Sequence, residues 1–515
     1  MANSKKMILV ASLTIFAKLV AITRQVVLTY CFGASTTTDA YILSQTIPNT
    51  LFLLVSSAIG VSFMPIFNQI CNEKNDNEAE FFTTRMVNSV LIIASVIVVV
   101  TMLFSRKIIF VFASGFDNET ARLAANYLRL SIFSIYFIGM CGIFSAYLKI
   151  KGDYFSPSII GIVLSIVEIV SCVLAYYFND IILAIGITAA SMAQFLVVFV
   201  AAIRKGYRRH RKIGIWDEYI KRAILMSFPI MLGLGVDEIN VIVDKTIASG
   251  FQMGSISALN YANTLVSIVH NVISVSINTV LFTEVSRLAA EDNRKEIALR
   301  IHESLHNALL LLIPSTVGLI IFAQPIIQIM YERGNFTHES TLLTAGAMAF
   351  YALYIIPNGV RLISQSFFYA YGKTKFCMYV GFIAVAVNTT LNLYLSRIMG
   401  INGLALATSV GVTVSAIIIF VKLLQENKEI NLRKLFKSSI IMVGNSIVMG
   451  IVSIWTFRYI NSRASIFASL IMAIFIAIII YFFMSILTKT LDRTAINKLI
   501  QRGVDEVRCS HEAEK

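Results

Sequence analysis

The chain consists of long apolar stretches separated by short polar segments. An α-helix needs about 20 apolar residues to cross the hydrocarbon core of a bilayer, and most of the stretches reach that length. Their apolar residues do not alternate with a period of two, which argues against the strands of a membrane β-barrel. The pattern predicts about fourteen membrane-spanning helices, at residues 7–31, 40–68, 86–112, 123–148, 156–178, 181–203, 223–248, 256–283, 304–330, 341–370, 376–397, 401–424, 436–458 and 464–488.

The composition supports an all-α polytopic membrane protein. Of the 515 residues, 57% are apolar and 14% are charged, whereas a soluble protein carries roughly 25% charged residues. This composition excludes a disordered or collagen-like chain. The polar segments between the stretches are short, so they leave no room for a soluble catalytic domain. We therefore expect the protein to act inside the bilayer.

The net charge of +14 is distributed unevenly along the chain. With the N-terminus placed inside, the inner segments hold 31 Lys and Arg residues and the outer segments hold 7. Cytoplasmic loops carry such an excess, so both termini are predicted to be cytoplasmic. The basic run at 204–212 then predicts a cytoplasmic linker between two bundles, and binding of nucleic acid is not expected.

Two halves of the chain resemble each other at an offset of 217 to 220 residues. Phe32-Gly33 corresponds to Ser249-Gly250, and Ser114-Gly115 corresponds to Arg333-Gly334. Each repeat holds six spans, which predicts a parallel repeat with a pseudo-two-fold axis along the membrane normal and alternating access between the halves. The predicted parts are a first six-helix bundle (1–213), a second six-helix bundle (214–430), an extra pair of transmembrane helices (431–488) and a cytoplasmic tail (489–515).

Charged residues at membrane depth are the first candidates for a binding site. An ionised side chain at the bilayer centre costs about 2.5–3.5 kcal/mol, so such residues usually mark a cavity. Lys18 and Arg24 share the first span, Asp39 begins the second and can partly neutralise them, and Arg361 lies within the tenth. A cationic cavity suits an anionic substrate, and phosphate matches a guanidinium group best. The alternatives are snorkelling, a structural pair between Arg24 and Asp39, and intramembrane pairing of Arg361.

Oxygen-bearing side chains form a second candidate site. Asp237 follows two glycines in the segment 233–240, which suggests a loosened helix whose free carbonyls bind a cation. Asn388 and Asn392 lie one turn apart, and Thr408 lies on the next span. These hard ligands suit Na⁺ or a proton site, whereas hydrogen bonding between helices is the alternative.

His302-Glu303-Ser304-Leu305-His306 matches the HExxH pattern of zinc metalloproteases. A zinc site needs a third protein ligand, and Glu332, His338 and Glu339 are predicted on the opposite side of the membrane. An intramembrane metalloprotease is therefore the weakest of the alternatives.

Several motifs resemble those of the MurJ (MviN-type) lipid II flippase family, within the multidrug/oligosaccharidyl-lipid/polysaccharide (MOP) exporter superfamily. The resemblance covers nearly the whole chain. The matching motifs are Arg24 with 32–35, 38–41 and 47–49, the outer-loop segment 331–337 (YERGNFT), 368–375 and 402–409.

The resemblance implies two six-helix bundles plus a helix pair, in the bacterial cytoplasmic membrane. It implies that the protein moves the lipid-linked peptidoglycan precursor (lipid II) from the inner to the outer leaflet, in contact with membrane lipids and the cell-wall synthesis machinery. By this resemblance, the family's cavity residues correspond to Lys18, Arg24 and Asp39. The family's sodium ligands correspond to Asp237, Asn388, Asn392, the Leu404 carbonyl and Thr408. The groove for the polyprenyl tail corresponds to the last two spans.

Some positions depart from the family pattern. Phe52 and Leu53 stand where arginines are frequent, and Thr264 replaces a cavity arginine. Gln25 replaces an acid after Arg24, and Asn392 stands where an Asp occurs. This less cationic cavity keeps an exporter of another polyprenyl-pyrophosphate-linked glycan (exopolysaccharide or O-antigen type) as an alternative. A cation-coupled drug exporter would need an acidic cavity, against which Lys18 and Arg24 argue.

Overall fold

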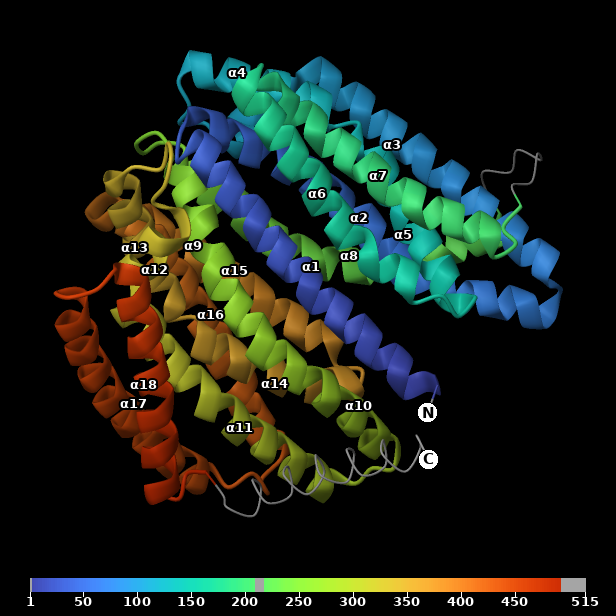
Figure 1. Cartoon of the computed structure of the whole chain (residues 1–515). Helices are drawn as coiled ribbons and strands as arrows, with labels where there is room; N and C mark the ends of the chain where they lie inside the picture. Colours follow the sequence, from blue (N-terminus) through green and yellow to red (C-terminus); the bar gives the residue numbers. More distant parts are fainter. Residues whose placement is uncertain (1, 209–216, 492–515) are drawn as a thin grey trace, which may run out of the picture. The chain divides into compact units, whose positions relative to one another are not determined.

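The computed structural model describes residues 2–208 and 217–491, apart from the side chains of 2–9, 11, 53–61, 226–234, 236 and 237. Over this part the chain forms eighteen α-helices and one π-helical turn, with no strand (Figure 1). The all-α prediction is confirmed. The end of the predicted linker (209–212) and the predicted tail from 492 onward lie outside the described residues.

Among the described residues, eleven helices are long and apolar enough to cross a membrane. A twelfth span arises if α4 (Asn118–Ser131) and α5 (Ser134–Ile150) are taken together, since they meet at a bend of 42°. Together they cover the predicted span 123–148. The chain is therefore a polytopic helical membrane protein, as predicted.

The helices fall into two compact units, which are described separately. The first comprises residues 1–261, 331–343 and 389–404. In it, α1 packs against α6, α6 against α7, and α2 against α4 and α8. Aromatic side chains fill much of its core, including Phe52, Phe63, Phe82 and Tyr147. The helices of this unit are α1 (Ala2–Phe32), α2 (Thr36–Glu73), α3 (Asp76–Phe112), α4, α5, α6 (Phe155–Tyr177), α7 (Ile181–Arg204) and α8 (Glu218–Ala248).

The second unit comprises residues 262–330, 344–388 and 405–515. Its helices are α10 (Ser276–Ala290), α11 (Arg294–Ile321), α14 (Ile355–Ala370), α17 (Leu432–Asn461) and α18 (Ile466–Leu487). Five helices contribute residues to both units: α9 (Ser255–His270), α12 (Ala323–Tyr331), α13 (His338–Ala352), α15 (Thr374–Met399) and α16 (Ile401–Glu426).

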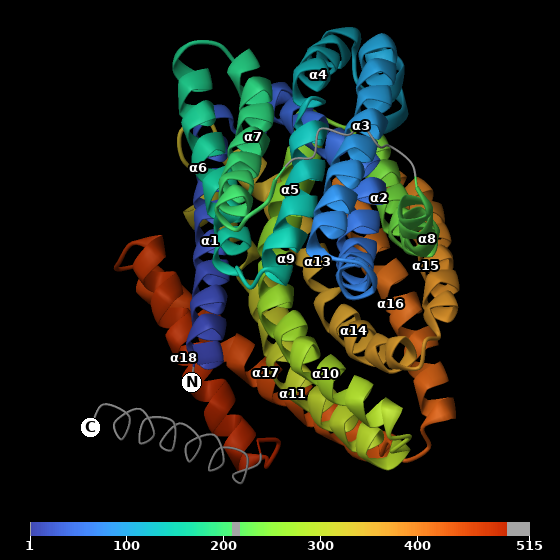
Figure 2. The same cartoon turned by 90° about the vertical axis from the view of Figure 1, so that its right-hand side faces the viewer.

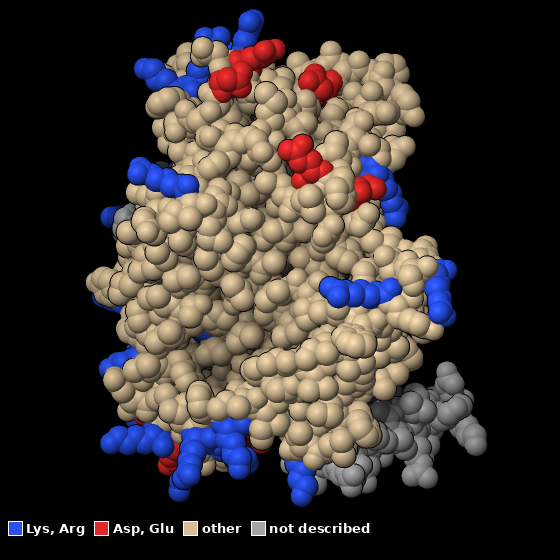
Figure 3. All heavy atoms as spheres, turned by 90° about the vertical axis from the view of Figure 1, so that its left-hand side faces the viewer, with Lys and Arg blue, Asp and Glu red and all other residues tan. Residues whose placement is uncertain are grey.

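The last two helices, α17 and α18, lie side by side in both views (Figures 1 and 2). Phe467, Phe475 and Phe483 of α18 are exposed. Broad stretches of the face shown in Figure 3 likewise carry no Lys, Arg, Asp or Glu. Exposed apolar surface of this extent is expected of helices that face lipid.

Helix α2 begins at a defined turn. Gly33 has φ +63° and ends α1, and the Ser35 hydroxyl accepts a hydrogen bond from the Thr38 backbone N–H. The Thr38 hydroxyl accepts one from the Ser35 backbone N–H, which completes a capping box. This turn fixes the direction of Asp39 in the first turn of α2.

The predicted loosening of the helix around Asp237 is wrong. The backbone of α8 is helical from Glu218 to Ala248, through Gly233 and Gly235. A glycine weakens a helix by only about 1 kcal/mol, whereas an unsatisfied carbonyl in lipid costs several kcal/mol. The continuous helix is therefore the cheaper structure. Irregular backbone occurs instead in the π-helical turn Asn271–Val275.

Candidate functional site

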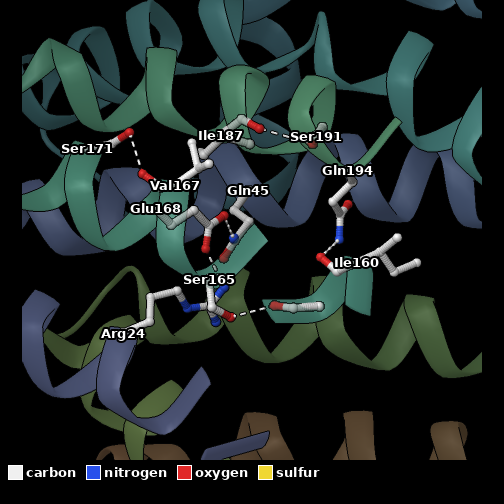
Figure 4. Close-up of polar contacts among 11 residues, drawn as sticks. Arg24, Gln45, Ile160, Ser165, Val167, Glu168, Ser171, Ile187, Ser191 and Gln194 are labelled. Carbon is white, nitrogen blue, oxygen red and sulfur yellow. Dashed lines mark hydrogen bonds and ion pairs between the residues drawn. The ribbon is translucent and has the colours of Figure 1, made fainter. Parts of the chain in front are cut away.

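Arg24 of α1 forms an ion pair with Glu168 of α6 (Figure 4). The second carboxylate oxygen of Glu168 accepts a hydrogen bond of 3.0 Å from Gln45 Nε2 of α2. The Arg24 side chain is 28% exposed and that of Glu168 only 2%. The Arg24 side chain therefore keeps an accessible part, while its acidic partner is turned into the protein.

Glu168 was not predicted from the sequence. It is the only Asp, Glu, Lys or Arg of α6, whose sequence is otherwise apolar and small-polar. The criterion that singled out Lys18 and Arg24, a charge at membrane depth, applies to Glu168 equally and would have found it.

Lys18 lies on α1, six residues before Arg24, and its side chain is exposed. The two bases and Glu168 together leave one positive charge in excess. A cationic and partly accessible strip of α1 is thus retained despite the ion pair, and such a strip favours an anionic group.

Asp39 does not neutralise the bases, and that expectation is wrong. Its side chain is buried, and its carboxylate accepts hydrogen bonds from the backbone N–H groups of Gly254 (2.9 Å) and Ser257 (2.7 Å). The Ser257 hydroxyl donates a further bond of 2.5 Å. The carboxylate sits at the start of α9, where unpaired N–H groups favour an anion. Asp39 thus fastens the beginning of α2 to the beginning of α9.

Two further contacts involve the residues just before α2 and just before α9. A Cβ added to Gly33 would lie 2.3 Å from the Asn335 carbonyl oxygen, and one added to Gly115 would lie 2.4 Å from the Gly250 Cα. Asn335 also donates from its backbone to Tyr30 (3.0 Å). We call these contacts, with the Asp39 bonds, the loop seal.

The loop seal follows the sequence repeat. Gly33 corresponds to Gly250, and Gly115 corresponds to Gly334, which directly precedes Asn335. Gly33 touches Asn335, and Gly250 touches Gly115. In each contact a glycine of one repeat meets the outer loop of the other repeat, and the two contacts differ only in which repeat supplies the glycine. A pseudo-two-fold axis requires such reciprocal contacts.

Arg361 lies in a polar chain of the second unit. Its Nε donates to Asn358 Oδ1 (3.1 Å), and Asn358 Nδ2 lies 2.9 Å from His270 Nε2. His270 was not predicted. The intramembrane pairing that the sequence left open for Arg361 is thus a hydrogen bond to a neutral amide.

The predicted sodium ligands form two separate contacts. Within the second unit, Asn388 Nδ2 donates to Thr408 Oγ1 (3.2 Å). Within the first, Asn392 Nδ2 donates to Asp244 Oδ1 (2.5 Å), which brings in a carboxylate outside the predicted set. Leu404 is buried, and the side chain of Asp237 lies outside what the structure describes.

A family model described as "Lipid II flippase MurJ" matches residues 28–476. The chain belongs to the MurJ family. A relative from Thermotoga maritima, named "Probable lipid II flippase MurJ", is 27% identical over 511 residues, which cover 98% of this chain and 100% of the relative. One from Buchnera aphidicola subsp. Schizaphis graminum with the same name is 25% identical over 431 residues, 82% of this chain and 83% of the relative.

Solved structures agree with this assignment. A structure titled "Lipid II flippase MurJ, inward closed conformation" is 27% identical, covers 94% of this chain and 100% of its own, and superposes with a TM-score of 0.80. An inward-facing multidrug resistance transporter of the MOP superfamily reaches a TM-score of 0.68 at 13% identity, over 80% of this chain and 94% of its own. That second likeness shows a shared fold.

The departures from the MurJ pattern have structural counterparts. Phe52 is fully buried, and its ring packs so closely on Gly139 that a Cβ there would lie 2.6 Å away. An arginine at 52 would need a different core. Gln25 removes the acid next to Arg24, and Glu168 supplies a carboxylate from α6 instead.

The HExxH segment makes packing contacts. His306 Nε2 lies 2.9 Å from the Thr490 carbonyl, and its Nδ1 lies 3.3 Å from Ser438 Oγ. Both ring nitrogens thus bind other parts of the same unit. Among the described residues, no cluster of three or more His, Cys, Asp or Glu side chains has the geometry of a metal site.

Proposed function

We propose that this MurJ-family chain is a lipid II flippase, which moves the lipid-linked peptidoglycan precursor across the bacterial cytoplasmic membrane. The match of residues 28–476 to the lipid II flippase family carries the proposal. The family match makes the chain a transporter rather than an enzyme, and flipping needs no covalent bond to form or break. Exporters of another glycan or of drugs are not favoured by the family match.

The proposed architecture has fourteen spans, in bundles 1–213 and 214–430 followed by the pair 431–488 and a cytoplasmic tail 489–515. The concentration of Lys and Arg in the inner segments supports cytoplasmic termini. The reciprocal contacts of Gly33 with Asn335 and of Gly250 with Gly115 support a pseudo-two-fold relation of the two bundles. With this orientation, the loop seal closes the outer side.

The substrate pyrophosphate would meet Arg24 and Lys18, whose charges and partial exposure suit an anion. The polyprenyl tail would lie along α17 and α18, where apolar surface is exposed. Arg361 would add a third positive group. Flipping then requires that the loop seal opens while the inner side closes.

We also propose Na⁺ as a coupling ion near Asp244 and Asn392. Asn392→Asp should place two carboxylates in contact and make the fold depend on a cation. We expect Na⁺, but not K⁺, to raise the melting temperature of this variant more than that of the unmodified chain, because binding at 100 times the Kd stabilises by about 2.7 kcal/mol.

Asn445→Asp provides the matched control for this experiment. Asn445 is equally buried, but it donates to a neutral hydroxyl, that of Thr488. It should gain no sodium dependence. Equal melting temperatures of Asn392→Asp in Na⁺ and K⁺ would contradict the coupling site.

Complementation tests the proposed function. Bacteria depleted of their own lipid II flippase should grow and keep their shape when they express this chain. Arg24→Gln should not rescue them at the same membrane abundance, whereas Gln194→Ala, which loses a hydrogen bond to the Ile160 carbonyl, should. Lysis of cells that contain the folded chain in the membrane would refute the function.

A further inference from the structure

Glu168 occupies an unusual position for an acid. Its carboxylate is buried at the junction of three helices, where Arg24 of α1 and Gln45 of α2 engage its two oxygens (Figure 4). Removal of two ionised groups from water is costly, and a buried pair is often no more stable than apolar residues of the same volume. Stabilisation of the fold alone therefore does not explain the pair.

We propose that Glu168 is a resident counter-ion of Arg24, which a phosphate group of the substrate replaces, and that Glu168 takes up a proton in the exchange. The proposal rests on the proposed function, because it takes Arg24 as a phosphate contact. The ion pair with Glu168 breaks, and an ion pair between Arg24 and a phosphate oxygen forms. A hydronium ion or a buffer acid of the solvent gives up one proton to the Glu168 carboxylate and is left as water or as the buffer base.

The proton uptake follows from burial. With Arg24 turned to a phosphate, the Glu168 carboxylate would keep only the neutral amide of Gln45. A buried carboxylate without a cation is strongly disfavoured and becomes neutral instead.

Among the described residues, the groups that interact electrostatically with Glu168 besides Arg24 include the Tyr41 phenol of α2 and the Cys172 thiol of α6, and neither is a cation. Lys18 of α1 is exposed, six residues before Arg24. Helix α7 carries one charged residue, Arg204 at its last position, and α5 carries Lys149 in its last turn. Both lie near helix ends, whereas Glu168 lies in the middle of α6.

The two side chains differ in a way that suits exchange. Arg24 is 28% exposed and can turn toward an incoming anion, whereas Glu168 is fixed by burial at 2% exposure. A purely structural pair would keep Arg24 bound to α6 in every state. Substrate affinity would then be indifferent to the protonation of Glu168.

Binding of lipid II to the purified full-length chain between pH 5.5 and 8 tests the proposal. The pyrophosphate diester stays fully ionised over this range, so its own charge does not change. We expect the affinity of the unmodified chain to weaken by up to about tenfold per unit of rising pH. Glu168→Gln should bind independently of pH and more tightly at pH 8, and Glu168→Asp should keep the dependence.

Ser171→Ala is the matched control on α6. Its hydroxyl donates to the Val167 carbonyl of the same helix, so the variant should show the unmodified pH dependence. A flat pH profile of the unmodified chain, or an equal slope in Glu168→Gln, would overturn the exchange.

Two further measurements separate the possible failures. Arg24→Gln that binds lipid II normally would refute the phosphate contact, and with it the proposed role of Arg24. Loss of binding in Arg24→Gln, together with a lipid II affinity of the unmodified chain that does not change with pH, would refute the exchange and leave the phosphate contact of Arg24 standing. If Glu168→Gln does not fold, the number of protons taken up on binding can be measured on the unmodified chain, by calorimetry in two buffers of different ionisation enthalpy. We expect uptake of about one proton per lipid II bound, and uptake of none overturns the proposal.

Discussion

Replacement of Arg24 by alanine is expected to abolish lipid II transport. A charge-assisted hydrogen bond contributes about 1.5–3 kcal/mol, so its loss should weaken binding by about 10- to 150-fold. The same substitution leaves Glu168 buried without its cation, so that the carboxyl must take up a proton to stay buried, and folding stability falls by up to ~3–5 kcal/mol. Binding of lipid II and the melting temperature should therefore fall together.

The double variant Arg24→Gln/Glu168→Gln separates these two effects. It replaces the ion pair by neutral amides and removes the unpaired charge. We expect the melting temperature to recover while binding stays weak. Recovery of binding in the double variant would show that Arg24 acts only through stability.

The Asp39→Ala variant is expected to open the loop seal. The substitution leaves the buried N–H groups of Gly254 and Ser257 without their acceptor, at about 1–3 kcal/mol each. Since 1.4 kcal/mol shifts an equilibrium tenfold, the sealed state should lose at least about tenfold in population relative to open states. Cys31 reports the change, because its thiol is buried and its carbonyl accepts a hydrogen bond from Asn335 of the seal.

A membrane-impermeant maleimide added from outside should label Cys31 faster in Asp39→Ala than in the unmodified chain. Asp117→Ala is the control, because Asp117 caps α4 by accepting from the Glu119 backbone and takes no part in the seal. Unchanged labelling of Cys31 in a folded Asp39→Ala variant would show that the Asp39 bonds do not hold the seal.

The fold could be predicted from the sequence because its main signals are local. Long apolar stretches without a period of two leave a chain in lipid no alternative to helices. The contacts of Gly33 and Gly115, which the sequence did not predict, join corresponding positions of the repeat at 217 to 220 residues. The local glycine signal misled at α8, where backbone hydrogen bonds in lipid outweigh the weak helix propensity of Gly233 and Gly235.

The candidate site was predicted only in part, because its partners are distant in sequence. Arg24 and Glu168 are 144 residues apart, and Asp39 lies 215 residues from Gly254. Proximity in sequence suggested that Asp39 would serve Arg24. Its carboxylate instead binds backbone N–H groups at the start of α9. Every residue except proline has such a group, so the side chains of this segment do not indicate that it binds Asp39.

Transbilayer movement of lipid II in vesicles that contain only the purified chain tests the central claim most directly. The claim is that Arg24, whose side chain is partly exposed, receives the phosphate of a lipid that this protein carries across the membrane. We predict that lipid II moves between the leaflets far faster with the unmodified chain than in protein-free vesicles, and that the Arg24→Gln/Glu168→Gln variant does not exceed the protein-free rate. Equal rates for the unmodified chain and this variant would contradict the account.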